Sequence, residues 1–308
     1  RDRSPSRGLG DVYKRQHLLS LVDLRLDNSA NPSIWSEVFM STDPSGRQVK
    51  VTVVGAGIVG AAISYSLAKR GAAVTVIDRS RPGSGATNHS FAWINATAKH
   101  PVSYHDFNRR SLVMWDRFAK GLDVDVGLRW GGQMEWAVTE EGAAELKSRA
   151  AQLHAWGYPC QILDGAEMSR MEPSISPGSV TAAIYCELDG IVEPTLAAEA
   201  CIRAAIEHGA TTILETEVTD LTSDSQHISV EVGGEKIKPD VVVLAGGVDN
   251  TPLAAMVGVT IPQQNSPGVV IRTNPISQPL LSNVSVVYAP PLEPVSYTHL
   301  TLPTILLV

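Results

Sequence analysis

Residues 49–78 read VKVTVVGAGIVGAAISYSLAKRGAAVTVID and contain a strand, a glycine turn, a helix and a second strand in close succession. Residues 50–54 alternate and are rich in β-branched side chains, which predicts a strand. Residues 61–70 are rich in helix formers and stop before Gly71, a common way for a helix to end. Residues 73–77 predict a second, buried strand. The segment therefore predicts a βαβ unit of an α/β fold.

The turn between the first strand and the helix matches the pattern G-x-G-x-x-G at Gly55, Gly57 and Gly60. In such a turn the first glycine permits the tight bend, the second lets a pyrophosphate approach the backbone, and the third lets helix and strand pack closely. Asp78 lies 18 residues after Gly60, at the end of the second strand, where an acidic residue accepts hydrogen bonds from an adenosine ribose. We therefore expect a dinucleotide at this turn. A glycine-rich turn without a ligand is the alternative.

The sequence after Asp78 bears on which dinucleotide binds. An NAD-dependent dehydrogenase continues with further β–α units, whereas this chain enters a Gly/Ser/Pro loop at residues 79–88. It then predicts helices at residues 101–121, 139–157 and 194–208, a strand or hairpin at 127–138, and a strand at 181–186. An apolar, fully buried strand returns only at residues 240–244. A nucleotide domain interrupted in this way favours a flavin over a nicotinamide, and an NAD-dependent dehydrogenase remains the alternative.

Four motifs in this order resemble the DAO family of FAD-dependent D-amino-acid, glycine and sarcosine oxidases and dehydrogenases. They are the opening unit, the loop GSGAT at residues 83–87 leading to FAWIN at 91–95, the run DGIVEP at 189–194, and the strand with its turn, DVVVLAGG, at 240–247. The resemblance spans about residues 49–273. It implies a Rossmann-like FAD-binding domain interrupted by an α+β substrate domain with a mainly antiparallel sheet.

The resemblance also implies residue contacts with FAD. Ile58 and Val59 are expected under the pyrophosphate, and Asp78 and Arg79 beside the adenosine ribose. The remaining contacts are Ala86 and Thr87 on the diphosphate or ribityl chain, Phe91, Ala92 and Trp93 near the isoalloxazine ring, Val218 beside the adenine, and Ala245, Gly246 and Gly247 against the cofactor. Phe91 and Trp93 are alternatively ordinary core aromatics.

His89 lies where the dimethylglycine and sarcosine dehydrogenase branch carries a covalently attached flavin. This sequence departs from that branch at Asn88, where the branch tends to have an aromatic residue, and at Ala92, where glycine is common. These departures favour a loop histidine that hydrogen-bonds to FAD or to solvent, and covalent attachment is the alternative.

The resemblance implies a reaction at the carbon next to an amine nitrogen, with hydride passing from Cα to flavin N5 and hydrolysis of the resulting imine. The substrate would be a small amino acid or secondary amine whose carboxylate is held by an Arg or Tyr. Arg272, Tyr185 and Arg129 are candidates for that clamp, and no catalytic residue is identified. A further alternative is an FAD-binding subunit that needs a second chain for activity.

The expected domain boundaries follow from these motifs and from the chain ends. Residues 1–16 and 295–304 resemble translated adapter sequence of the kind found in metagenomic reading frames, and Met40 resembles a natural start. Family members usually continue well beyond residue 294, so we expect a C-terminally truncated fragment. The expected parts are a non-native or disordered leader at 1–39, FAD-binding segments at 40–100 and 191–260, substrate-domain segments at 101–190 and 261–294, and an artefact-like tail at 295–308.

Composition restricts the remaining function classes. The chain of 308 residues is 44% hydrophobic and 19% charged, typical of a globular protein. Its net charge of −7 and lack of a basic stripe argue against a nucleic-acid partner. The 3 cysteines are too few and too widely spaced for a disulfide framework or metal knuckle, which predicts reduced thiols and a cytoplasmic location. No run of 18 apolar residues predicts a membrane span, and no metal-spaced His/Cys cluster is evident.

Overall fold

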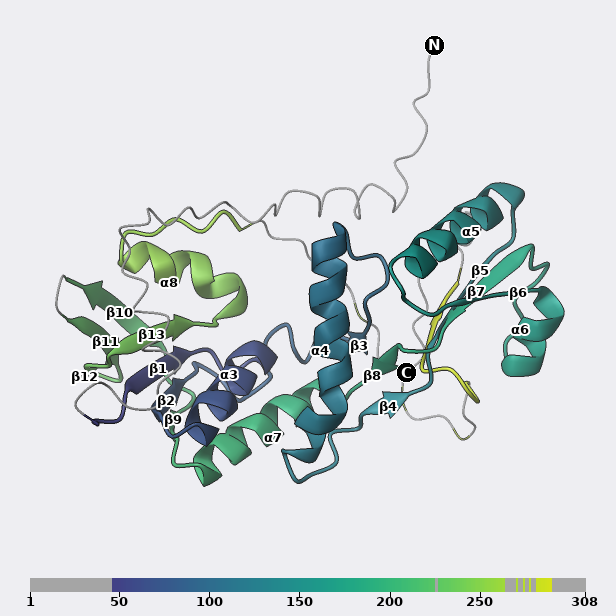
Figure 1. Ribbon diagram of the computed structural model, residues 1–308. Coiled ribbons are helices and arrows are strands. Elements are labelled where there is room, and N and C mark those ends of the chain that lie inside the picture. Colours follow the sequence, from purple (N-terminus) through teal and green to yellow (C-terminus); the bar gives the residue numbers. More distant parts are fainter. Residues whose placement is uncertain are drawn as a thin grey trace, which may run out of the picture.

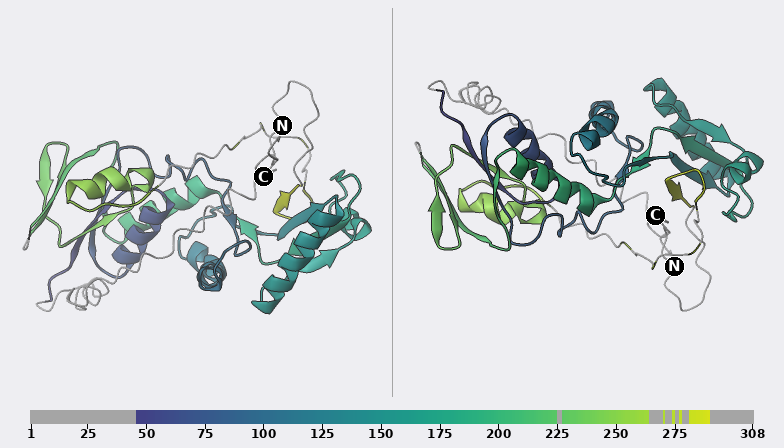
Figure 2. Two further views of the ribbon diagram at one scale, coloured as in Figure 1. Left: turned by 90° about the horizontal axis from the view of Figure 1, so that it is seen from above. Right: turned by 90° about the horizontal axis from the view of Figure 1, so that it is seen from below.

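The computed structural model describes residues 46–224, 227–263, 270, 274, 277 and 281–289. Within them the strands form four sheets. Figure 1 shows a parallel sheet with its helices at one end of the molecule and a mainly antiparallel sheet at the other, with helix α4 (Val102–Lys120) standing between them. The views from above and below in Figure 2 show the same order of parts along the molecule. The predicted α/β class is confirmed.

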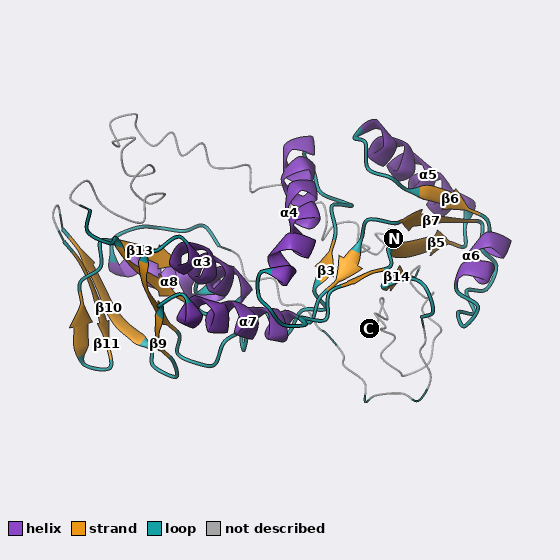
Figure 3. Cartoon of the chain, turned by 60° about the horizontal axis from the view of Figure 1, so that its bottom comes forward, coloured by secondary structure: helices purple, strands orange, loops and turns teal. Residues whose placement is uncertain are grey.

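The parallel sheet has the order β13-β1-β2-β9, and every pairing in it is parallel. Its strands are β1 (Lys50–Val54), β2 (Ala73–Ile77), β9 (Thr211–Ile213) and β13 (Val241–Leu244). Helices α3 (Ile58–Lys69) and α7 (Pro194–Glu207) lie side by side on one face of this sheet (Figure 3). Small buried side chains such as Ala61, Ala197 and Cys201 allow this close packing.

The opposite face of the parallel sheet packs against a small antiparallel sheet and a short helix. The small sheet is formed by β10 (Val218–Ser223), β11 (Ile228–Val232) and β12 (Glu235–Ile237). A 3-10 turn, η2 (Gly247–Asp249), and helix α8 (Asn250–Met256) follow β13. Val54, Ile77, Val218 and Leu253 meet in the apolar cluster between these layers. The two faces of β1 and β2 are therefore covered by different parts of the chain.

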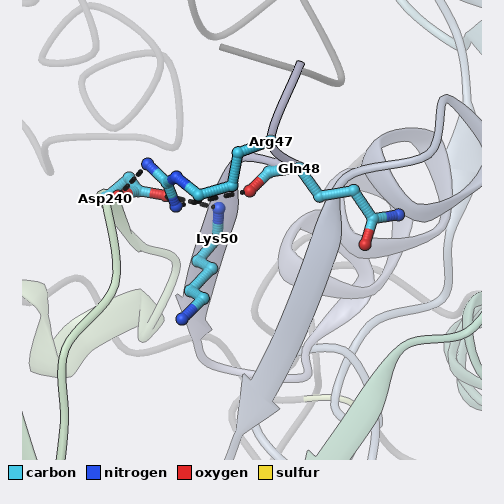
Figure 4. Close-up of polar contacts among 4 residues, drawn as sticks. All are labelled: Arg47, Gln48, Lys50 and Asp240. Carbon is cyan, nitrogen blue, oxygen red and sulfur yellow. Dashed lines mark hydrogen bonds and ion pairs between the residues drawn. The ribbon is translucent and has the colours of Figure 1, made fainter. Parts of the chain in front are cut away.

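The prediction that residues 240–244 form a fully buried strand is wrong in its burial. Strand β13 lies at the edge of the described sheet, and all four of its residues are only half-buried. The guanidinium of Arg47 donates to both carboxylate oxygens of Asp240 at 2.9 and 3.0 Å, and the backbone N–H of Lys50 donates at 2.7 Å (Figure 4). The Arg47 hydrogen bonds are the main reason that the pKa of Asp240 lies below its ordinary value. These contacts tie the start of β13 to the start of β1.

The sheet at the other end has the order β14-β5-β7-β6, in which only the β14–β5 pairing is parallel among the described strands. It comprises β5 (Gln133–Ala137), β6 (Gln161–Leu163), β7 (Ala182–Cys186) and β14 (Val286–Tyr288). Helices α5 (Glu140–Ala155) and α6 (Gly165–Met171) pack against it. Thr139 caps α5 by accepting from Gly142 N at 3.1 Å.

The fourth sheet, β3-β8-β4, is also small and lies between the two ends of the molecule. Its strands are β3 (Trp93–Ile94), β4 (Arg129–Trp130) and β8 (Gly190–Ile191). The expected strand or hairpin at residues 127–138 is instead two strands in two different sheets. Gly131 and Gly132 separate β4 from β5, and a Cβ at Gly132 would lie 2.4 Å from the ring of Tyr185.

Helix α4 forms as predicted, and its apolar side chains differ widely in burial. Leu112 is 4% exposed, whereas Phe107 is 67% exposed. Within the described residues, no helix combines the length and the apolar character that crossing a bilayer requires.

Candidate nucleotide-binding site

The glycine turn after β1 is built so tightly that two of its three glycines admit no side chain. Gly55 has φ +111°, and a Cβ there would lie 2.3 Å from the carbonyl oxygen of Ala245. A Cβ at Gly60 would lie 1.9 Å from the carbonyl oxygen of Gly55. Gly57 differs, because the nearest atom to a Cβ there is Thr87 Oγ1 at 3.4 Å. The first and third glycines are thus required by packing, whereas the second leaves the backbone open to a ligand.

Helix α3 begins at this turn with its N-terminus accessible. Its N-cap residue, Gly57, supplies no side-chain cap. The hydroxyl oxygen of Thr87 instead accepts from the backbone N–H of Ile58 at 3.0 Å. Val59, in the first turn, is 63% exposed. A helix N-terminus with open backbone donors and a positive dipole end suits a phosphate group.

Asp78 closes the other side of the turn. Its carboxylate accepts from the backbone N–H of Ala56 at 2.6 Å and from that of Ser80 at 2.7 Å. These two hydrogen bonds fix the carboxylate between the glycine turn and the loop after β2. An ionised carboxylate has about four acceptor positions, so room remains for two hydroxyl donors.

A pocket of about 140 Å³ opens beside Asp78, between the parallel sheet and α8. Five of the predicted cofactor contacts line it: Gly55, Asp78, Arg79, Val218 and Gly246. Arg79 also forms an ion pair at 2.8 Å with Asp249 of η2, which lines the same pocket. The structure therefore brings the predicted adenosine-side residues together.

The pocket also has a wall that the sequence did not predict. Thr216 and Glu217 precede β10, and Pro252, Leu253 and Met256 lie on α8. Helix α8 comes shortly after the Ala245–Gly247 turn, with η2 between them. The turn motif was therefore the sequence feature from which this wall could have been predicted. The turn is held by a hydrogen bond from Ala245 N to Val54 O at 2.7 Å and one from Gly246 N to Asn250 Oδ1 at 2.7 Å. Gly247, with φ +61°, starts η2 and is not among the lining residues.

In the loop after β2, Thr87 contacts the N-terminus of α3, whereas the residues around it are exposed to solvent. Ala86 and His89 are exposed. The His89 ring nitrogen Nδ1 lies 2.9 Å from the carbonyl oxygen of Gly85. Its contact with the cofactor, by a hydrogen bond or by covalent attachment, stays a prediction.

Phe91, Ala92 and Trp93 are half-buried and lie where the chain enters strand β3 of the β3-β8-β4 sheet. The rings of Phe91 and Trp93 are stacked with centroids 6.4 Å apart, and Ala92 has φ +51°. Trp93 Nε1 donates to Asp189 Oδ2 at 2.8 Å. The orientation of Trp93 is thus set by a residue that is 96 positions away in the sequence.

Asp189 is a buried carboxyl to which no role was assigned from the sequence. It is 0% exposed and accepts hydrogen bonds from Trp93 and from the hydroxyl of Tyr158. Burial raises its pKa to about 7, although both hydrogen bonds act in the opposite direction. Burial, with Asp189 as a second cause, also raises the pKa of Tyr158. The DGIVEP motif contains Asp189, but nothing in the sequence indicated its partners.

Glu172 is a second fully buried carboxyl outside the predicted site. Its oxygens accept from the backbone N–H groups of Ser282, Asn283 and Val284 at 2.7, 2.5 and 2.6 Å. These three donors precede β14. Glu172 therefore fixes a segment that joins the sheet from more than a hundred residues later in the chain.

The proposed carboxylate clamps do not converge in the structure. Arg272 lies outside the described residues. Arg129 is exposed on β4, and the Tyr185 hydroxyl donates to Gly131 O at 3.1 Å. Within the described residues, no group of three or more His, Cys, Asp or Glu could hold a metal ion.

Comparison with known proteins shows where this arrangement recurs. The family model "FAD dependent oxidoreductase" (DAO) matches residues 50–304, which includes part of the expected artefact-like tail. A glycine oxidase from Geobacillus kaustophilus is 30% identical over 217 residues, covering 68% of this chain and 58% of that protein. One of the subunits of an opine oxidase from Rhizobium meliloti is 27% identical over 236 residues, covering 73% of this chain and 63% of that protein.

Solved structures give the same result for the fold. The glycine oxidase from Geobacillus kaustophilus superposes with a TM-score of 0.68 at 28% identity, covering 79% of this chain and 66% of that chain. L-proline dehydrogenase from P. horikoshii superposes with a TM-score of 0.67 at 25% identity, covering 78% and 64%. The chain spans less than two thirds of the length of these relatives.

Proposed function

The chain belongs to the DAO family of FAD-dependent oxidoreductases, and from this premise we propose that it binds FAD at the glycine turn and oxidises the Cα–N bond of a small amino acid or secondary amine. The observation that carries the proposal is the geometry around the glycine turn. Gly55 and Asp78 line one pocket, the Asp78 carboxylate accepts from Ala56 N of the turn, and Thr87 accepts from Ile58 N where α3 begins. The family match favours FAD over the NAD alternative.

The residues present fit the adenosine diphosphate part of FAD. Gly57 leaves the space that a side chain would fill, and Val59 stands exposed at the positive end of α3. Asp78 is oriented by Ala56 and Ser80 before any ligand arrives, which reduces the ordering that binding must impose. We assign Ile58, Val59 and Thr87 to the phosphates and Asp78, Arg79 and Val218 to the adenosine.

When bound, FAD accepts the two electrons and the hydrogen that leave the substrate carbon, and the imine product is then hydrolysed by water. The chain's own residues bind and orient. Asp189 and Tyr158 hold Trp93 in one orientation, with its ring against Phe91. We propose that this aromatic pair forms part of the wall beside the flavin ring and shields it from water.

The substrate class is tested by reduction of the bound flavin without oxygen. The chain reconstituted with FAD is mixed with glycine, sarcosine, D-alanine or an opine, and the visible flavin band is followed. Loss of the band with at least one amine supports the proposal. A band that dithionite bleaches but no amine affects would contradict it.

A role as one chain of a larger enzyme is a second candidate, favoured by the similarity to opine oxidase subunits. Co-expression with neighbouring reading frames and size-exclusion chromatography would test it: a second polypeptide that co-elutes and is required for amine-dependent bleaching supports this role. We also propose a cytoplasmic location, supported by three cysteines that are all free and buried.

A further inference from the structure

Two cysteines lie opposite each other at one end of the β6–β7 pair. The register pairs Gln161 with Tyr185, so Cys160 and Cys186 are the next opposed residues along the two chains. Both are buried, at 6% and 0% exposure. Directly opposed residues of antiparallel strands have Cα atoms about 4.5–5.5 Å apart, within the roughly 4.4–6.8 Å that a disulfide spans.

The surroundings of Cys160 distinguish it from an ordinary buried thiol. His154 Nε2 lies 3.5 Å from Cys160 Sγ, and His154 is an exposed residue of α5. The neighbouring Cys186 thiol is the main cause that lowers the pKa of the Cys160 thiol, and the charges of His154 and Arg149 act in the same direction, whereas burial opposes them. The Cys160 thiol and burial raise the pKa of Cys186. Because Cys160 Sγ lies beside the His154 ring and Cys186 is fully buried, we assign Cys160 as the nucleophilic partner and Cys186 as the proton-bearing one.

Cys201 is an internal comparison. It is also buried, on α7, but burial alone raises its pKa to about 12 and no second thiol is among the causes. Cys160 therefore differs from Cys201 in having a second thiol, His154 and Arg149 as neighbours, and in being slightly less buried.

We propose that Cys160 and Cys186 form a reversible dithiol–disulfide site that reacts with peroxides. The Cys160 thiolate attacks one peroxide oxygen, so that an S–O bond forms, the O–O bond breaks, and the leaving hydroxide becomes water on taking a proton. The sulfur of Cys186 then attacks the Cys160 sulfenic acid. The S–S bond forms, the S–O bond breaks, and the proton of Cys186 leaves with hydroxide as a second water. The two thiols lose two electrons and the peroxide gains them. The site does not depend on the proposed function.

The test treats the full chain with hydrogen peroxide, blocks the remaining thiols by alkylation, and maps the cysteines by mass spectrometry without reduction. The expected product has lost two hydrogens, links the peptides containing Cys160 and Cys186, and reverts with dithiothreitol. Cys201 stays alkylated throughout. A Cys186→Ala variant should stop at a Cys160 sulfenic acid that dimedone traps, and Cys201→Ala should behave as the wild type.

Two outcomes would overturn the proposal. One is a wild-type chain in which, after peroxide treatment, Cys160 and Cys186 are still free thiols that the alkylating reagent modifies. The other is oxidation of Cys201 at the same rate as Cys160, because we expect a difference of roughly ten-fold or more from thiolate character. The wild-type measurement decides both, so a variant that fails to fold does not leave the proposal untested.

Discussion

The nucleotide-binding region and the sheet that contains β14 are held together by different kinds of contact. Around the glycine turn, the fit depends on backbone against backbone, as where Gly60 approaches the carbonyl of Gly55 and Gly55 approaches Ala245. Around β14, a single buried side chain, Glu172, satisfies three backbone donors from a distant segment. The glycine turn is therefore disrupted by adding a side chain, whereas the segment before β14 is disrupted by removing the Glu172 carboxylate.

The difference determines how each region responds to substitution. A close backbone contact is broken by adding a methyl group, which forces chain movement. Truncating the side chain that carries a buried carboxylate removes its hydrogen bonds and leaves the former donors without partners. Each region is therefore tested by its own kind of change, with an exposed control.

The largest effect is expected for Glu172→Ala. One buried and two partly buried hydrogen bonds from backbone N–H groups would lose their acceptor, and we expect the free energy of unfolding to fall by about 4 kcal/mol. Urea unfolding measures the change. Glu187→Ala, at an exposed position near the same sheet, is the control and should change stability by less than about 0.5 kcal/mol. Equal effects at the two positions would show that the three hydrogen bonds do not hold β14.

A smaller effect is expected for Gly60→Ala. Its Cβ would lie 1.9 Å from Gly55 O, so α3 must move away from the turn, and the loss should be about 3 kcal/mol. Gly85→Ala is the matched control, because nothing lies within 4 Å of a Cβ there. If both variants unfold at the same urea concentration, the turn is not packed as described.

The third prediction concerns pH and Asp189. Burial raises its native pKa from 3.8 to about 7, so between these values the native state holds more protons than the unfolded state. Stability therefore falls as pH rises through this window. Each unit of pKa difference corresponds to about 1.4 kcal/mol in the free energy of unfolding. Because the buried site relaxes, we expect the loss of stability across the whole window to be about 2 kcal/mol.

Asp189→Asn should remove this dependence. Urea unfolding gives the free energy of unfolding of the wild type and of the variant at several pH values. The difference between the two, plotted against pH, isolates the contribution of Asp189 from that of the other carboxyls. Asp106→Asn, at an exposed position of α4, should leave the wild-type slope intact. A difference curve that is flat for Asp189→Asn would mean that this carboxyl does not titrate in the window.

The smallest effects distinguish two helix caps. Thr139 caps its own helix, α5, whereas Thr87 caps α3 from a distant loop. Thr139→Val and Thr87→Val should each lower stability by about 1 kcal/mol. Only Thr87→Val should also weaken FAD binding, measured by quenching of flavin fluorescence. Equal affinity in the two variants would place the phosphates away from Thr87.

The two regions also differed in how far the sequence predicted them. The glycine turn, β1, α3 and β2 were predicted correctly, because each follows from local spacing and from the φ and packing needs of particular glycines. The half-burial of β13 was not predicted, since an apolar run looks the same at the edge and in the middle of a sheet. The partners of Asp189 and Glu172 were not predicted either, because they are 31 to 112 residues away and no local pattern encodes such pairings.

The most direct test of the account is an FAD titration of the purified chain, followed by the visible spectrum before and after acid precipitation. Gly57→Val and Asp78→Ala are compared with Gly85→Ala, and circular dichroism verifies that each variant is folded. The account predicts a flavin spectrum for the wild type and Gly85→Ala, and its loss in the other two folded variants. Flavin that stays with the acid precipitate would indicate attachment at His89. A wild type that binds NAD but not FAD, or an unchanged affinity for FAD in Gly57→Val and Asp78→Ala, would contradict it.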